Sequence, residues 1–181
     1  PPPPPHAPTP PPPKPAPPIS TSQRGRPPPP PPKTKTRLHH LRFDKVARIP
    51  VPDLEVQGDK DDAALLIVGF GSTYGHLYSA MQELRAKGYK IALAQFKYVN
   101  PLPKNTAEVL SRYKKVVVAE QNLGQLAALL RIRINNFAPY QYNQVKGQPF
   151  VVQELVQGFE RLLTLPAPKD ESGTFYSRIL Q

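Results

Sequence analysis

The chain has 181 residues, no cysteine and 27 prolines, of which 19 precede residue 33. Residues 1–49 carry nine Lys/Arg and one acidic residue, whereas residues 50–181 carry fifteen Lys/Arg and twelve acidic residues. The lack of cysteine excludes a disulfide framework, a thiolate nucleophile and an iron–sulfur cluster ligated by this chain. No apolar run approaches the ~20 residues that span a bilayer, and the chain does not begin with a signal segment, so we expect a cytoplasmic protein.

The first 37 residues form a proline-rich stretch whose only large aliphatic residue is Ile19. Such a segment cannot bury enough apolar surface to offset the entropy of folding, so residues 1–37 are predicted to be a disordered tail with polyproline II character. Within it, residues 24–30 and 28–33 fit the two orientations of a basic, proline-rich SH3-type ligand. Such matches arise easily in polyproline, and an inert tail is the favoured interpretation.

From Ala63 onward, short apolar runs alternate with segments of helical periodicity, which is typical of an α/β domain. The predicted strands are Ala64–Val68, Lys90–Phe96, Lys115–Ala119 and Gln141–Val145. The predicted helices are Leu77–Gly88, Asn105–Tyr113, Gly124–Ile134 and Phe150–Leu163. Four successive strand–helix units predict a parallel sheet with helices on both faces. We therefore assign residues 38–62 to a linker, 63–163 to one domain and 164–181 to a loose C-terminal tail.

Two helices carry more specific signals. Asn105 and Glu108 have the spacing of a capping box at the start of the second helix. The third helix has one apolar stripe, formed by Leu123, Leu126, Ala127, Leu130 and Ile134. Leu129 and Ile132 lie off that stripe, so the helix is predicted to make contacts beyond the one sheet face that it covers.

The glycine-rich turn after the first strand is the obvious candidate for a nucleotide site. Its glycines have the spacing G-x-G-x-x-x-G, and no acidic residue ends the second strand to hold a ribose. We therefore favour a tight strand-to-helix turn over a phosphate site. His76 follows this turn and is interpreted as a hydrogen-bonded structural residue, because no partner for catalysis stands near it in the sequence. Glu120 ends the third strand, but it is a single carboxylate.

No catalytic, cofactor-binding or metal site is predicted for this chain. His39 and His40 lack cysteine or carboxylate neighbours at ligand spacing. Nucleic acid is not an expected partner, because the positive charge lies in a tail without interleaved aromatic residues.

Four segments, each at the end of a predicted strand, resemble the C-terminal part of the alpha subunit of 2-oxoacid:ferredoxin oxidoreductases, and those of the 2-oxoglutarate type most of all. They are Ile67–Gly75, Tyr98–Pro103, Val117–Leu126 and Gln144–Phe150. The resemblance extends from about Leu38 to Leu163. It implies a transketolase C-terminal-like domain.

The resemblance also implies a whole enzyme that oxidises a 2-oxoacid to its acyl-CoA and passes electrons to ferredoxin, using thiamine diphosphate, coenzyme A and an iron–sulfur cluster. The diphosphate and the cluster would belong to a beta subunit, so this chain binds no cofactor and is inactive alone. What the resemblance assigns to this chain is a set of loops that contact neighbouring domains or the beta subunit. These candidate interface residues are Gly71, Ser72, Thr73, Tyr74, Gly75, His76, Asn100, Pro101, Pro103, Glu120, Asn122, Gly124 and Gln125.

Two classes of function stay open on the sequence alone. The first is a fragment of that alpha subunit with a structural role at an interface. The second is a stand-alone interaction module whose proline-rich tail is an SH3-type ligand.

Overall fold

The computed structural model describes residues 32–168 and 179–180, and the predicted disordered tail lies outside this part except for its last residues. The chain divides into two compact units, Pro1–Arg42 and Phe43–Gln181. Helix α1 (Pro32–Ala47) was not predicted and occupies the end of the tail and the start of the linker. Pro32 is compatible with a first helical position, where its missing N–H costs no hydrogen bond. No further proline or glycine follows before Ala47, so nothing in this segment breaks the helix.

The second unit is built on one sheet with the strand order β1-β3-β2-β4-β5-β6. The strands are β1 (Val56–Gly58), β2 (Leu65–Phe70), β3 (Ile91–Phe96), β4 (Val116–Glu120), β5 (Tyr140–Asn143) and β6 (Ile179–Leu180). All neighbouring strands are parallel except β1, which pairs with β3 in the antiparallel sense. The predicted parallel α/β fold is therefore confirmed, with an additional strand at each edge.

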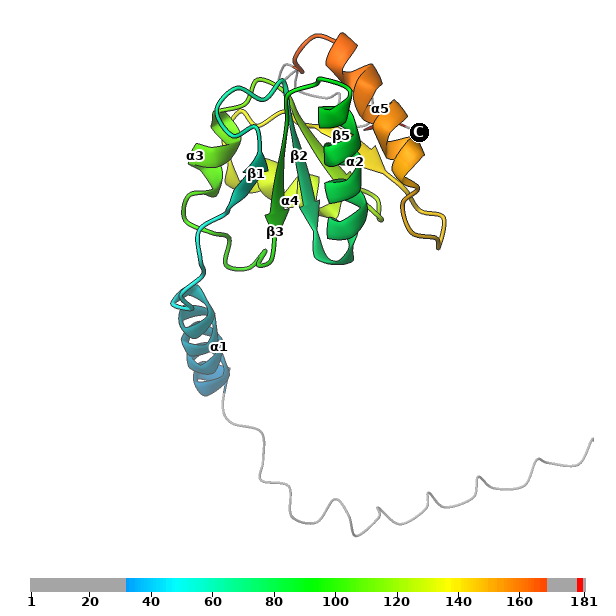
Figure 1. The fold of residues 1–181 in the computed structure, drawn as a ribbon. Coiled ribbons are helices and arrows are strands. Elements are labelled where there is room, and N and C mark those ends of the chain that lie inside the picture. Colours follow the sequence, from blue (N-terminus) through cyan, green and yellow to red (C-terminus); the bar gives the residue numbers. More distant parts are fainter. Residues whose placement is uncertain (1–31, 169–178, 181) are drawn as a thin grey trace, which may run out of the picture. The chain divides into compact units, whose positions relative to one another are not determined.

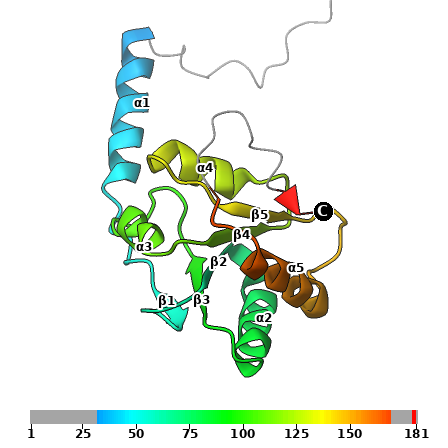
Figure 2. The ribbon, with the colours of Figure 1, turned by 90° about the horizontal axis from the view of Figure 1, so that it is seen from above.

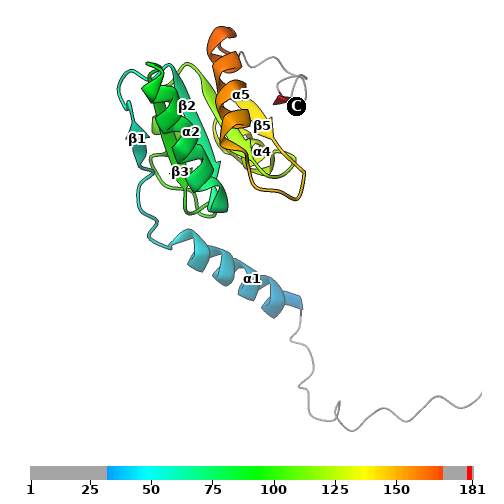
Figure 3. The same cartoon turned by 45° about the vertical axis from the view of Figure 1, so that its right-hand side comes forward.

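Helices cover both faces of the sheet, as predicted. They are α2 (Tyr74–Ala86), α3 (Thr106–Ser111), α4 (Gln125–Arg133) and α5 (Val152–Thr164), and a short 3-10 turn, η2 (Gly71–Thr73), precedes α2. Helices α2 and α5 lie side by side on one face, and α3 and α4 lie on the other (Figures 1, 2 and 3). The central strands explain this arrangement, since β2, β3 and β4 are buried on both faces and are rich in Val, Leu, Ile and Ala.

The folded unit begins before Ala63, the position at which the sequence analysis placed the domain boundary. Strand β1 lies in the assigned linker, and Leu54 just before it is buried in the core. Asn105 explains how this segment is held, because its side chain accepts a hydrogen bond from the Leu54 amide (2.8 Å) and donates one to the Leu54 carbonyl (3.1 Å). The predicted capping box is therefore wrong: Asn105 stands at the N-cap of α3 but makes no side-chain capping bond.

Strand β1 is also fixed at its other end, by Asp59. This carboxylate accepts hydrogen bonds from the side chain of Arg85 in α2 (2.9 Å) and from the amide of Ile91 (3.0 Å). The hydrogen bond from Arg85 lowers the pKa of Asp59. The stabilisation from this contact is present above the ordinary carboxylate pKa and is lost as the pH falls through the lowered value.

The segment assigned to a loose C-terminal tail is tied to the sheet at two points. Tyr140 of β5 donates a hydrogen bond from its hydroxyl group to the carbonyl of Pro166. Further on, Ile179 and Leu180 pair with β5 as the short strand β6. Residues 169–178 lie outside the described part of the chain.

Gly69 near the end of β2 leaves no room for a side chain, and this gives a first prediction. A Cβ atom there would overlap with Leu77 Cδ1 and Gln95 Oε1 and would lie 3.1 Å from Thr73 Oγ1. We expect Gly69→Ala to lower the free energy of unfolding by about 1–3 kcal/mol, because the side chains of Leu77 and Gln95 would have to repack. Gly75→Ala is the matched control, since a Cβ atom at Gly75 would have no neighbour within 4 Å. Thermal melts of the two variants check this, and equal melting temperatures would contradict it.

Candidate functional site

The predicted interface loops all follow the carboxyl ends of parallel strands, the edge at which open α/β sheets bind ligands. The structure divides them into two groups. Gly71, Tyr74 and Pro103 line one cavity beside β1 and β3. Glu120, Asn122, Gly124 and Gln125 surround the N-terminus of α4. The other predicted residues lie after β2 or in the loop after β3: Ser72, Gly75 and Asn100 are exposed, His76 and Pro101 are half-buried, and Thr73 is buried.

Glu120 is a structural carboxylate at the N-terminus of α4. Only 3% of its surface is exposed. Its two carboxylate oxygens accept hydrogen bonds from the amides of Leu126 (2.7 Å) and Ala127 (2.9 Å). The backbone carbonyl of Glu120 also accepts the amide of Gln144, in the loop after β5. A negative charge at this end of a helix is stabilised by the helix dipole, so Glu120 joins β4, α4 and the next loop.

Asn122 and Gly124 complete this helix start. The side-chain oxygen of Asn122 accepts the amides of Gly124 (2.7 Å) and Gln125 (3.0 Å). Gly124 has a φ of +93°, and a Cβ atom there would overlap with the side chain of Gln141. The first amides of α4 are thus already bonded within the chain, and the residues present do not fit a phosphate or diphosphate group.

The glycine-rich turn after β2 likewise closes on itself. The Thr73 hydroxyl donates to the carbonyl of Phe70 (2.9 Å) and accepts the amide of the same residue (3.3 Å). Gln95 of β3 donates from its side chain to the carbonyl of Gly71 (3.0 Å). The side chain of His76, in the first turn of α2, makes no hydrogen bond to any residue that the structure describes, so the expected hydrogen-bonded histidine is not observed.

Three of the four central parallel strands are followed by an exposed apolar side chain, and we call this set the apolar row. It consists of Phe70 at the end of β2, Leu123 after β4 and Val145 after β5. Leu123 is 77% exposed, so its predicted place on the inner stripe of the helix is wrong. The reason is that α4 begins only after Gly124, whose left-handed backbone takes Leu123 out of the helical register. Leu126, Ala127 and Leu130 of the predicted stripe are buried.

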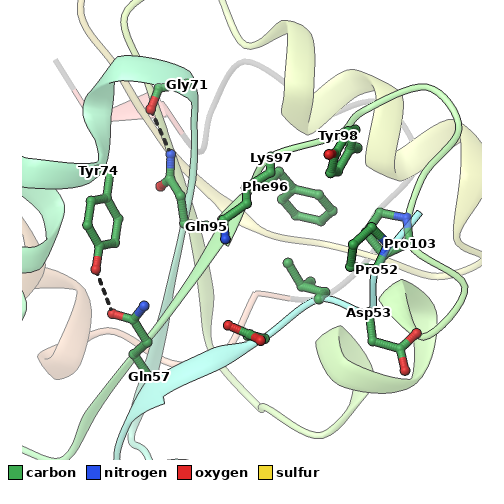
Figure 4. A pocket seen from close by; sticks show the side chains of 12 residues that line it. Pro52, Asp53, Gln57, Gly71, Tyr74, Gln95, Phe96, Lys97, Tyr98 and Pro103 are labelled. Carbon is green, nitrogen blue, oxygen red and sulfur yellow. Dashed lines mark hydrogen bonds between the residues drawn. The ribbon is translucent and has the colours of Figure 1, made fainter. Parts of the chain in front are cut away.

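The cavity beside β1 and β3 has a volume of about 680 Å³ and two chemically different walls (Figure 4). One wall, the polar wall, is formed by Gln57, Tyr74 and Gln95. The opposite wall, the ring wall, is formed by Pro52, Phe96, Tyr98 and Pro103. Asp53, Glu55 and Lys97 also line the cavity and are exposed to solvent.

Most of this cavity was missed because its residues lie in the assigned linker or at the end of β3. One signal in the sequence was available: Leu54, Glu55, Val56 and Gln57 alternate between apolar and polar, the period of a half-buried strand. The run is short and is preceded by Pro50 and Pro52, so the pattern alone does not distinguish a strand from a linker.

Among residues 32–168 and 179–180, no group of three or more His, Asp or Glu side chains could hold a metal ion. Within the same residues, no helix has the length and apolarity needed to cross a bilayer.

Comparison with known proteins shows which family the domain matches. Residues 63–155 match the family model described as pyruvate:ferredoxin oxidoreductase core domain II. The chain is 45% identical over 115 residues to the 2-oxoglutarate oxidoreductase subunit KorA of Mycobacterium tuberculosis, which covers 64% of this chain and 18% of that protein. It is 32% identical over 118 residues to the alpha subunit of 2-oxoacid:ferredoxin oxidoreductase 2 of Aeropyrum pernix, with the same coverage.

A solved structure shows the same fold. It is the 2-oxoglutarate:ferredoxin oxidoreductase from Magnetococcus marinus with 2-oxoglutarate, coenzyme A and succinyl-CoA bound. The TM-score is 0.63 at 29% identity, over 73% of this chain and 24% of that one. The chain therefore spans less than a quarter of each of these relatives.

The structural role of Glu120 gives a second prediction. We expect Glu120→Ala to lower the free energy of unfolding by about 1–3 kcal/mol, because two buried amides at the start of α4 would lose their acceptor. Glu154→Ala is the control, since Glu154 also lies in the first turn of a helix but is largely exposed. Chemical denaturation of both variants tests this, and an unchanged midpoint for Glu120→Ala would refute the structural assignment.

Proposed function

This chain belongs to the pyruvate:ferredoxin oxidoreductase core domain II family, and we propose that it is this domain of the alpha subunit of a 2-oxoglutarate:ferredoxin oxidoreductase. The observation that supports the substrate is the 45% identity to a subunit of a 2-oxoglutarate oxidoreductase. The whole enzyme would oxidise 2-oxoglutarate to its acyl-CoA in the cytoplasm and pass the electrons to ferredoxin.

In this proposal the thiamine diphosphate and the iron–sulfur cluster are held by the beta subunit, and coenzyme A binds to the assembled enzyme. The residues of this chain do not fit these groups. The sequence has no cysteine to ligate a cluster, and Glu120 and Asn122 already bond the amides at the start of α4 that would face a diphosphate. The contribution of the domain is therefore structural.

The apolar row supports an interface at the carboxyl edge of the sheet. Phe70, Leu123 and Val145 are large apolar side chains, and 42%, 77% and 65% of their surfaces are exposed. They belong to three successive strands of the sheet, β2, β4 and β5, so they lie along one edge. Burial of such side chains against another domain or subunit would be favourable by the hydrophobic effect. We propose that this edge contacts the rest of the alpha subunit or the beta subunit.

The stand-alone interaction module, with its proline-rich SH3-type ligand, is not favoured by any of the relatives. The matched region lies in the folded domain, and residues 1–31 lie outside the described part of the chain.

A domain exchange tests the proposed activity. Residues 43–168 would replace the corresponding segment of the M. tuberculosis alpha subunit, which is produced together with its beta subunit. We expect the hybrid enzyme to reduce a viologen dye with 2-oxoglutarate and coenzyme A, whereas the isolated chain should not. Dye reduction by the isolated chain, or a hybrid that assembles but is inactive, would contradict the proposal.

The apolar row gives a further prediction within the same hybrid. Leu123→Glu should reduce assembly with the beta subunit, measured by sedimentation, and leave the melting temperature of the isolated chain unchanged, because an exposed charge costs little. Ile132→Glu is the matched control: Ile132 is 80% exposed and lies at the opposite end of α4. Equal assembly of the two variants would remove the argument for an interface at this edge.

A further inference from the structure

The cavity beside β1 and β3 lies away from the apolar row and has the properties of a binding site. Its volume of about 680 Å³ falls in the range of sites that enclose a small ligand or a few residues of a peptide. In the ring wall, Pro52 and Tyr98 are exposed, Tyr98 by 47%, whereas Phe96 and Pro103 are buried behind them. The ring of Tyr74, on the other side, lies 5.7 Å from the ring of Tyr78 at a tilt of 35°, so aromatic surface continues from the cavity along α2.

The hydrogen-bonding groups of the cavity favour a ligand that carries acceptors. The Tyr74 hydroxyl group donates a hydrogen bond to Gln57 Oε1 (3.0 Å), and the side-chain amide of Gln95 donates one to the carbonyl of Gly71. These two donors are therefore already occupied. Gln57 Nε2 and Lys97 Nζ have no acceptor among the described residues, so both can donate to a ligand. A polypeptide segment made of prolines has free carbonyl groups and no backbone N–H groups, and this matches the donors of the cavity.

The charges of the cavity favour a cation near those carbonyl groups. Asp53 and Glu55 are exposed, and neither forms an ion pair with a residue that the structure describes. The only cationic lining residue is Lys97, so the cavity has a net negative charge although residues 50–181 carry more basic than acidic residues. An arginine beside a proline run could pair with these carboxylates and lie against the ring of Tyr98.

We propose that this cavity is a receptor for a proline-rich peptide segment that carries arginine, supplied in trans by a partner protein. Proline rings in a polyproline II segment pack well on aromatic faces and lose little conformational entropy on binding. Three features of the cavity fit this one ligand chemistry together: its aromatic and proline rings, its unused donors, and the two carboxylates that form no ion pair with a described residue.

Titration with a synthetic peptide tests the proposal. The probe is SQRGRPPPPPPK, which has the sequence of residues 22–33 of this chain and the required composition. The receptor is the full chain with Arg24→Gln and Arg26→Gln, so that its own copy of the motif does not compete. We expect saturable amide shifts in ¹H–¹⁵N spectra at residues 52–57 and 95–98. Absence of shifts with millimolar peptide would overturn the proposal.

Two receptor variants test which side chains bind. Tyr98→Ala should weaken peptide binding by about tenfold without changing the melting temperature, because it removes an exposed aromatic contact. Tyr89→Ala is the control, since Tyr89 is 40% exposed and lies outside the cavity, and its affinity should be unchanged. Asp53→Lys should also weaken binding, whereas Asp61→Lys, an exposed site elsewhere, should not. Equal effects of variant and control in either pair would contradict the assignment of peptide binding to this cavity.

Two altered peptides test the ligand chemistry. A peptide with all six prolines replaced by serine keeps the charges, and a peptide with both arginines replaced by glutamine keeps the prolines. We expect each to bind at least about tenfold more weakly than the parent, because each lacks one of the two required features. Full affinity of the serine peptide would show that the cavity is a general cation site and would contradict the proposal.

Discussion

The buried carboxylate of Glu120 organises the functional edge of this domain. It ends the central strand β4, accepts the first amides of α4, and through its backbone carbonyl holds the loop that follows β5. A carboxylate without these partners would be costly to bury. The positions of β4, α4 and the loop after β5 therefore depend on one another. The backbone amides at the N-terminus of α4 are thus used in hydrogen bonds within the domain. This arrangement leaves Leu123 and Val145, on either side, directed to the surface, where they can serve an interface.

The central fold could be predicted from the sequence because apolar runs such as Leu65–Val68 and Val116–Ala119 are short, continuous and followed by helical periodicity. Three features could not be predicted. Strand β1 has only three residues and depends on pairing with β3, a contact distant in sequence. Asn105 has the local sequence pattern of a helix cap, but its side-chain amide forms hydrogen bonds with the backbone of Leu54, which lies 51 residues earlier. Helix α1 follows a run of prolines that obscured it.

The predicted interface residues lie at the carboxyl edge of the sheet, but their chemistry depends on contacts that a sequence does not show. Glycines that suggested a nucleotide loop are explained by close packing at Gly69 and by a left-handed backbone at Gly71. The cavity combines residues 52–57 with the end of β3, and neither segment carries a motif. The proposed activity therefore rests on family membership. The proposed roles of the sheet edge and of the cavity rest on the geometry of the structure.

The central claim is that the carboxyl edge of the sheet is buried when the enzyme assembles. Hydrogen–deuterium exchange measured on the chain alone and in complex with the beta subunit and the remaining alpha domains tests it most directly. We predict slower exchange on assembly in residues 70–76, 121–125 and 144–149, and little change in the loops at the opposite edge, residues 87–90 and 134–138. Protection of the opposite edge with unchanged exchange in the first three segments would contradict the claim.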